Sequence, residues 1–260
     1  MPTVPPTPSM VPVPAIPVTP AQAATPQLSP LPPIAAISFD ADDTLWDFGA
    51  SFAVAISATA ERLRAEGLRR PSGSVTGEWL AELWTVAEAA AEPGTGLEVI
   101  RKASFTLALE ECGQPADPER IAEMFTTYNE TRWAAMKPFP EVVEVLGALA
   151  ERYPLAVTTN GNTDPARVGL DYFSCVTSAN ESGYQKPDPR MFHRTAERLG
   201  VDPGQVLHVG DHLAHDAVAA RAAGLQACWL NRLGPCPESR TAAEAGIQEI
   251  ADLTALLALP

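Results

Sequence analysis

The segment from Ile34 to Trp46 constrains the chain most strongly, because it joins a continuous apolar run to a cluster of carboxylates. It reads I-A-A-I-S-F-D-A-D-D-T-L-W, so three aspartates follow the run within four positions. An apolar run without alternation is typical of a strand buried on both faces of a parallel sheet. We therefore expect Asp40, Asp42 and Asp43 at the carboxyl end of such a strand, where open α/β sheets bind their ligands.

Crowded aspartates repel one another, which makes this cluster unfavourable in a purely structural turn. A proton or a divalent cation would relieve the repulsion, and carboxylate oxygens are ligands that magnesium accepts. The cluster therefore predicts a magnesium site with chemistry attached to it. The structural alternative is a solvated turn that is merely rich in aspartate.

The composition limits the classes of partner. The 260 residues suffice for one large domain or two small ones, and the formal net charge of -14 lacks the basic footprint of a nucleic-acid-binding protein. No apolar run approaches the roughly 20 residues of a membrane span. The four cysteines form no C-x-x-C pair, which favours reduced thiols over disulfides or a zinc site. We expect a cytoplasmic protein without nucleic-acid or membrane partners, and its oligomeric state stays open.

Residues 1–33 differ in kind from the rest of the chain. They contain twelve prolines and no charged residue. Proline at this density opposes both helix and sheet, and a secretory signal would need a basic region and an uninterrupted apolar segment. We predict a disordered, polyproline-like arm, with a ligand for a proline-binding domain as the functional alternative.

The remaining chain divides into a helical part and an alternating part. Residues 47–137 contain four successive segments with apolar residues at helical spacing, and Pro138 marks the return to the main body. Beyond this point strands are expected at 155–159, 173–178, 206–209, 225–230 and 247–250, with helices at about 141–152, from 164, and at 188–200 and 214–224. Strands that alternate with helices favour a parallel sheet covered on both faces.

Further polar residues follow the other predicted strands and complement the first aspartates. Thr159 and Asn160 offer a hydroxyl, an amide and backbone N–H groups near a helix N-terminus, which suits a phosphate. Lys186 can place a positive charge beside a transferring phosphoryl group. Asp211 and Asp216 add carboxylates. Each residue alone has an ordinary explanation in a turn, at the surface or at a helix start, but their joint order indicates a phosphate site beside a metal site.

These residues give the chain a specific resemblance to the haloacid dehalogenase (HAD) superfamily. The letters D-A-D-D-T at 40–44, T-N at 159–160, K-P at 186–187 and G-D-x4-D at 210–216 match its four motifs in order. The resemblance implies an α/β fold in which a Rossmann-like parallel-sheet core, at 34–46 and 138–260, carries an inserted all-helical cap domain at 47–137.

The resemblance also implies the chemistry of the first and last motifs. Asp40 would attack the phosphorus and form an aspartyl-phosphate, and Asp42 would protonate the leaving alkoxide and later deprotonate the attacking water. Mg2+ would be held by Asp40, by the backbone carbonyl of Asp42 and by Asp211. Asp43 is expected only to cap a helix or to face solvent.

The middle motifs are expected to hold the substrate. Thr159, Asn160 and Lys186 would bind the phosphoryl oxygens, and Asp216 would orient the site from its edge. The histidine before Gly210, His208, is expected to be a core residue with satisfied hydrogen bonds. The resemblance thus implies a hydrolase that acts on a small-molecule phosphate.

Other activities share the same motifs. A 2-haloacid dehalogenase keeps the nucleophile but attacks carbon and needs no acid at Asp42, so the presence of Asp42 favours a phosphatase. A non-catalytic member that binds a phosphorylated ligand would usually lack the nucleophile or a metal ligand, and neither is missing. A sugar-phosphate mutase would keep all of these groups and stays an alternative.

The substrate is less constrained than the reaction. The segments 155–173, 207–216 and 226–230 resemble most closely those of bacterial phosphatases that act on FMN and on the phosphorylated pyrimidine intermediate of riboflavin synthesis. Aromatic residues of the helical part could stack on such a ring or could simply form its core: Trp79, Trp84, Tyr128 and Trp133. We expect FMN or a phosphoribityl-pyrimidine among the better substrates, ahead of nucleotides and sugar phosphates.

Overall fold

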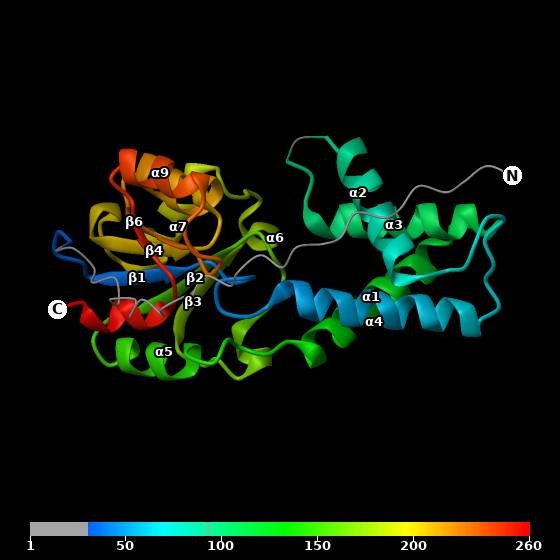
Figure 1. Ribbon diagram of the computed structural model, residues 1–260, viewed down its shortest axis with the longest axis horizontal. Coiled ribbons are helices and arrows are strands. Elements are labelled where there is room, and N and C mark those ends of the chain that lie inside the picture. The colour runs from blue at the N-terminus through cyan, green and yellow to red at the C-terminus, as the bar shows by residue number, and fades with distance from the viewer. Residues whose placement is uncertain (1–30, 93) are drawn as a thin grey trace, which may run out of the picture.

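Six parallel strands form a sheet in the order β3-β2-β1-β4-β5-β6 (Figure 1). The computed structural model describes residues 31–92 and 94–260, so the predicted arm lies outside the described residues up to position 30. The strands are β1 (Ala36–Phe39), β2 (Leu155–Thr159), β3 (Phe173–Ser178), β4 (Val206–Gly210), β5 (Gln226–Leu230) and β6 (Gln248–Ile250). The predicted α/β fold with a parallel, Rossmann-like sheet is confirmed.

Strand β1 lies at the point where the strand order reverses. Ile37 pairs with Leu155 of β2 on one side and with Leu207 of β4 on the other, and all three strands run parallel. The residues that follow these strands therefore emerge at the same edge of the sheet. In α/β sheets this switch point is where ligands bind.

Both faces of the sheet are covered, which explains the continuous apolar runs of its strands (Figure 1). One face packs on α5 (Val142–Ala150) and on the 3₁₀ helix η4 (Leu253–Ala258). Its buried side chains include Ile37, Phe39, Leu155, Val157, Leu207 and Val209. The other face packs on α7 (Pro189–Leu199) and α8 (Ala219–Ala222).

Several connecting helices differ from the predicted ones. The helix expected from residue 164 is a single 3₁₀ turn, η1 (Pro165–Val168), because Gly169 adopts a left-handed φ of 78° and ends it. The helix expected at 214–224 consists of a π-helical segment, η3 (Leu213–Val218), followed by α8. The sequence patterns also missed two short helices, α6 (Ala179–Ser182) and α9 (Pro237–Glu244).

Four helices follow β1 along the chain and precede α5, and Figure 1 shows them gathered beside the sheet. They are α1 (Phe48–Ala65), α2 (Gly77–Ala90), α3 (Leu97–Glu111) and α4 (Pro118–Ala135), and we call them the helical insertion. They share their own buried apolar cluster, which includes Trp79 and Tyr128. Within the part of the chain that the structure describes, none of the helices is both long and apolar enough to cross a bilayer.

Candidate active site

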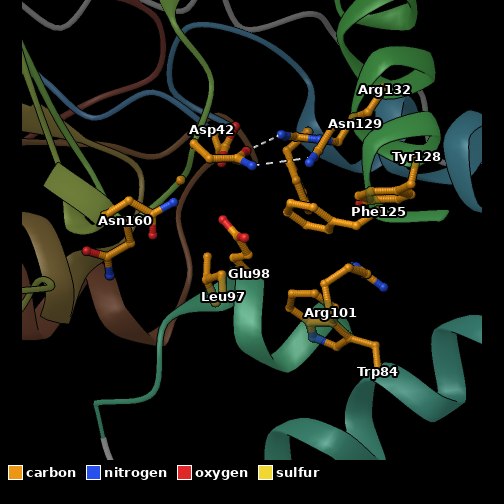
Figure 2. A pocket seen from close by; sticks show the side chains of 14 residues that line it. Asp42, Trp84, Leu97, Glu98, Arg101, Phe125, Tyr128, Asn129, Arg132 and Asn160 are labelled. Carbon is orange, nitrogen blue, oxygen red and sulfur yellow. Dashed lines mark hydrogen bonds between the residues drawn. The ribbon is translucent and has the colours of Figure 1, made fainter. Parts of the chain in front are cut away.

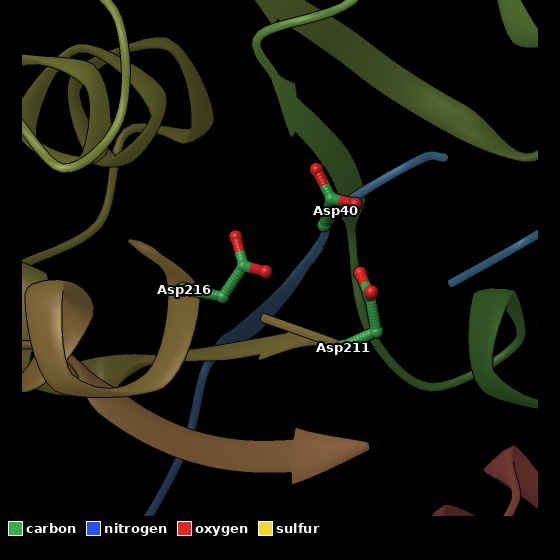
Figure 3. A group of neighbouring side chains, drawn as sticks. All are labelled: Asp40, Asp211 and Asp216. Carbon is green, nitrogen blue, oxygen red and sulfur yellow. The ribbon is translucent and has the colours of Figure 1, made fainter. Parts of the chain in front are cut away.

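Three carboxylates, which we call the carboxylate cluster, meet at the carboxyl edge of the sheet (Figure 3). Asp40 directly follows β1, Asp211 follows β4, and Asp216 lies in η3. One oxygen from each of the three lies within 4.8 Å of the other two. Asp216 can approach this closely because Gly210 has no side chain, since a Cβ there would lie 2.4 Å from Asp216 Cγ.

Lys186 is the buried cation of the cluster. Its ammonium group donates to Asp216 Oδ1 at 2.5 Å and also contacts Asp40 Oδ1. Burial opposes the charge of Lys186, but the two carboxylates hold its pKa above the ordinary value. Burial likewise opposes ionisation of Asp216, yet Lys186 and His208 bring its pKa well below the usual range. Lys186 and Asp216 therefore form the ion pair at the base of the site.

The pKa values of the other two carboxyl groups, Asp40 and Asp211, are raised and not lowered. Burial raises the pKa of Asp40 well above its usual value; Lys186 opposes this rise and Asp216 and Asp211 add to it. Burial and the neighbouring Asp216 raise the pKa of Asp211 to about 6. Thr44 Oγ1 donates to Asp211 Oδ1 at 3.1 Å, which fixes this carboxyl in place. Adjacent carboxyls that resist ionisation are a suitable donor set for a divalent cation.

Asp42 stands beside the cluster rather than in it. Its Oδ1 accepts a hydrogen bond of 2.7 Å from Trp46 Nε1, and burial raises its pKa although Arg132 opposes the rise. Gly161 permits this placement, because a Cβ at that position would lie 2.7 Å from Asp42 Oδ2. Asp43 instead accepts from the backbone N–H of Phe48 at 2.9 Å, at the start of α1.

Two of the predicted phosphate-binding residues lie at the end of β2: Thr159 is its last residue and Asn160 follows it. The Thr159 hydroxyl oxygen accepts from the Gly161 N–H at 2.9 Å. The Asn160 side chain accepts from the Lys186 backbone N–H at 2.7 Å and donates to the Lys186 carbonyl at 2.9 Å. The Asn160 amide therefore holds the segment that carries Lys186, a role that the sequence patterns did not suggest.

His208 is fully buried, as expected of a core residue, but it also contacts the site. Its Nε2 lies 3.4 Å from Asp216 Oδ1, and its Nδ1 lies 3.1 Å from the Ser38 hydroxyl. The Ser38 hydroxyl in turn forms a hydrogen bond of 2.8 Å with Thr158 Oγ1. These three polar residues interrupt otherwise apolar strands on one face of the sheet. Their presence in the sequence could have predicted a buried polar network there.

A cavity of about 230 Å³ adjoins Asp42 between the core loops and the helical insertion (Figure 2). Two hydrogen bonds join its walls: Arg132 Nη2 donates to Asn162 Oδ1 at 2.5 Å, and Asn162 Nδ2 donates to Asn129 Oδ1 at 3.4 Å. Phe48, Phe125 and Tyr128 also line it, together with Trp84, Arg101, Asn160 and Gly161. The motifs gave no signal for the two arginines, because they come from helices with ordinary bundle patterns.

All of the residues predicted for the site thus lie at one edge of the sheet. Asp40, Lys186, Asp211 and Asp216 are in mutual contact or close to it. Asp42 and Asn160 line the adjoining cavity, with Thr159 at the base of the same loop.

Comparisons with known proteins identify the family to which the chain is similar. A family model described as a haloacid dehalogenase-like hydrolase matches residues 34–224. The 5-amino-6-(5-phospho-D-ribitylamino)uracil phosphatase YigB of Escherichia coli (strain K12) is 33% identical over 88% of this chain and 98% of its own length. A glyceraldehyde 3-phosphate phosphatase of Methanopyrus kandleri is 31% identical over 76% of this chain and 84% of its own.

A solved structure provides the corresponding comparison of folds. The 2-haloacid dehalogenase from Pseudomonas syringae pv. Tomato DC3000 has a TM-score of 0.70 and 31% identity to this chain. The match covers 86% of this chain and 96% of the dehalogenase. The likeness therefore extends over both the sheet and the helical insertion.

Proposed function

The chain belongs to the haloacid dehalogenase-like hydrolase family, and from that premise we propose that it is a magnesium-dependent phosphomonoesterase that acts through an aspartyl-phosphate. The observation that carries the proposal is the placement of Asp40 and Asp42. One carboxyl sits in the cluster with Lys186, and the other faces the cavity two residues further on.

Magnesium fits the carboxylate cluster. As the family resemblance implies, Asp40, Asp211 and the backbone carbonyl of Asp42 would hold the ion. Asp40 and Asp211 have oxygens within 4.8 Å of each other, and Asp216 lies beside them. The raised pKa values of Asp40 and Asp211 support this assignment, because a cation would offset the repulsion that opposes their ionisation. The bound ion would supply charge neutralisation for the phosphoryl oxygens.

Asp40 acts as the nucleophile in the proposed reaction. One of its carboxylate oxygens forms a bond to phosphorus while the bond from phosphorus to the leaving oxygen breaks, which gives an aspartyl-phosphate. Water then attacks that phosphorus, the bond to Asp40 breaks, and inorganic phosphate leaves. Lys186 and the Thr159 hydroxyl hold the phosphoryl oxygens through both steps.

Asp42 transfers the proton in both steps. It gives its proton to the leaving alkoxide in the first step and takes one from the attacking water in the second. Burial raises its pKa, which favours the protonated form that the first step needs. A halide leaves without a proton, so a protonatable Asp42 beside the cavity favours a phosphatase over a dehalogenase.

We place the substrate among small-molecule phosphates of the cytoplasm, with a phosphoribityl-pyrimidine or FMN as the first candidates. The similarity to YigB supports the pyrimidine, and the aromatic side chains of the cavity can stack on a ring. Nucleoside monophosphates and sugar phosphates are the second choice. A sugar-phosphate mutase would use the same groups. It would release no inorganic phosphate, so a measurement of free phosphate distinguishes it from a hydrolase.

A phosphate-release screen tests the proposal. The panel contains FMN, a phosphoribityl-pyrimidine, nucleotides, sugar phosphates and phosphoglycolate, each with saturating Mg2+. Asp40→Asn should abolish release, because an amide is a poor nucleophile, and EDTA should do so reversibly. Asp43→Asn is the matched control, since Asn accepts the same hydrogen bond and tolerates the φ of 59° found there. Activity that survives both Asp40→Asn and EDTA would contradict the aspartyl-phosphate.

The same panel tests the choice of substrate. The pyrimidine and flavin phosphates should have the highest kcat/KM values. Both could instead have kcat/KM values about tenfold or more below that of the best nucleotide or sugar phosphate, a gap of about 1.4 kcal/mol in transition-state binding. The proposal of a pyrimidine or flavin substrate would then be wrong, whereas the proposed phosphatase activity would stand.

A further inference from the structure

Arg101 of α3 is a buried cation that forms no ion pair within the part of the chain that the structure describes. Only 2% of its surface is exposed, and its Nε and Nη1 atoms find no hydrogen-bond partner among the described residues. Among the described residues Arg101 forms no ion pair: Glu88 only helps to raise its pKa, and Glu98, which lines the same cavity (Figure 2), is paired with Lys102 at 2.5 Å. Burial lowers its pKa to about 10, with Tyr128 opposing the change, so the side chain stays charged at neutral pH. An unpaired charge in such a position is destabilising.

The other strongly buried cations of the described chain do have partners. Lys186, 4% exposed, contacts two carboxylates. Arg132, 3% exposed, donates to Asn162 and lies close enough to Asp42 to lower the pKa of that carboxyl. Arg101 thus differs from them in that its neighbours among the described residues are the rings of Phe52, Trp84 and Tyr128 and not a carboxylate or an amide.

Aromatic rings fix the guanidinium of Arg101 on the wall of the cavity. Its Cζ lies 3.5 Å from the centroid of the Trp84 ring and 4.7 Å from that of Tyr128, and all three residues line the cavity. Figure 2 shows Asp42 and Asn160 on the core side of this space and Arg101 and Trp84 on the side of the helical insertion. Arg101 is therefore placed toward the part of a substrate that lies beyond its phosphate.

We propose that Arg101 determines specificity by donating hydrogen bonds to acceptor oxygens on the leaving group of the substrate. The proposal rests on the phosphatase function above and adds a chemical class of leaving group to it. Ring carbonyls and a carboxylate share the required chemistry, because each presents oxygen lone pairs to a planar guanidinium. A leaving group that lacks such oxygens leaves the charge of Arg101 unpaired and gains nothing from it.

Arg101→Met tests the proposal, because methionine keeps much of the length and fits among aromatic rings while removing the charge. Three classes of substrate are compared: ring-carbonyl compounds (FMN and the phosphoribityl-pyrimidine), carboxylates (phosphoglycolate and phosphoserine), and phenyl phosphate, which has neither group. The variant should lower kcat/KM about 10- to 100-fold for whichever acceptor class the wild type prefers, the range for a lost hydrogen bond to a charged group. It should leave phenyl phosphate within about twofold, or about 0.4 kcal/mol, which is the limit expected for groups that do not interact.

Stability separates this role from a structural one. If Arg101 serves the ligand, Arg101→Met should lower the melting temperature no more than the control below, because each substitution removes an arginine stacked on a tryptophan. Arg70→Met is the matched control, since Arg70 also stacks on a tryptophan, Trp79, at 4.4 Å but lies near Glu111 and does not line the cavity. The control should change no substrate ranking.

Binding to Asp40→Asn protein keeps the proposal testable even if no substrate is turned over. Calorimetry with the same three classes should show weaker binding of the acceptor ligands when Arg101→Met is added, by about 10- to 100-fold in Kd. Arg101→Lys, which keeps the charge, should recover part of the loss. A uniform loss across all three classes together with a lowered melting temperature would overturn the proposal, and so would unchanged Kd values for the acceptor ligands. Absence of phosphate release from every substrate by the wild type would overturn the phosphatase instead.

Discussion

The Nε2 atom of His208 lies 3.4 Å from Oδ1 of Asp216, at the buried side of the carboxylate cluster. The ring is held from behind, because its Nδ1 lies 3.1 Å from Ser38 Oγ, and Ser38 is joined through Thr158 to Thr195 of α7 by contacts of 2.8 and 2.7 Å. A continuous set of buried polar groups thus connects a helix on one face of the sheet to the ion pair of Asp216 and Lys186.

His208→Leu should weaken the site without removing any group proposed to touch substrate. Residues that position the groups around a metal site typically contribute about 10- to 100-fold to metal affinity or activity. We expect the Mg2+ concentration for half-maximal activity to rise by about tenfold within that range. His208→Gln, which can still donate a hydrogen bond, should recover most of the loss. Equal effects of both substitutions would show that His208 only fills space.

Asp42→Asn should separate the two chemical steps. With p-nitrophenyl phosphate the leaving group needs little help from an acid, so the variant should still form the aspartyl-phosphate in a rapid burst of nitrophenol. Hydrolysis of that intermediate needs the base, and steady turnover should fall by about 10² to 10⁴. Rapid-mixing measurements of burst and steady rates check this. A variant that turns over alkyl phosphates at the wild-type rate would exclude Asp42 as the acid.

The pKa of Asp211 predicts how the stability of the metal-free protein depends on pH. In the folded state it is raised from 3.8 to about 6, so the folded protein binds more protons than the unfolded chain between these values. The contribution of Asp211 to stability is therefore present below about pH 4 and is lost as the pH rises through about 6. Asp211→Asn removes this dependence.

Chemical denaturation at several pH values, in EDTA, measures the effect. The unfolding free energy of Asp211→Asn minus that of the wild type should increase as the pH rises from about 4 to about 6, and then level off. Mg2+ should stabilise the wild type above pH 6 much more than the variant. If the difference in unfolding free energy stays constant across this range, the pKa of Asp211 is not raised in the folded protein.

The helical insertion is expected to move relative to the sheet during turnover, about short linkers near Asp47 and Pro138. A short bifunctional maleimide across Asn129→Cys and Asn162→Cys, two side chains that meet at 3.4 Å across the cavity, should stop turnover by holding it closed. Each single variant treated with the same reagent is the control, because Cys112, Cys175 and Cys236 are partly exposed in the native chain. Full turnover in the crosslinked double variant would show that no opening is needed.

The sequence by itself determined the sheet and the aspartates at its edge. Apolar strands that end at or just before Asp40, Thr159 and Asp211 indicate parallel strands whose carboxyl ends meet. This geometry follows from hydrogen-bonded pairing in register. Helix starts were also local, as at Asp188, whose side chain caps α7. The helix predicted from residue 164 was wrong for an equally local reason. Gly169 ends the 3₁₀ turn that begins at Pro165 before an α-helix can form.

Only the tertiary structure decided which side chains surround these groups. Arg101 and Arg132 come from helices whose patterns describe a bundle, and only the packing of α3 and α4 turns them toward the cavity. The pKa values of Asp211 and Asp216 shift in opposite directions because Lys186 donates to Asp216 and not to Asp211. Sequence motifs state which groups are present, whereas burial and distance set their charges, because electrostatic energies depend on the separation of groups and on their access to water.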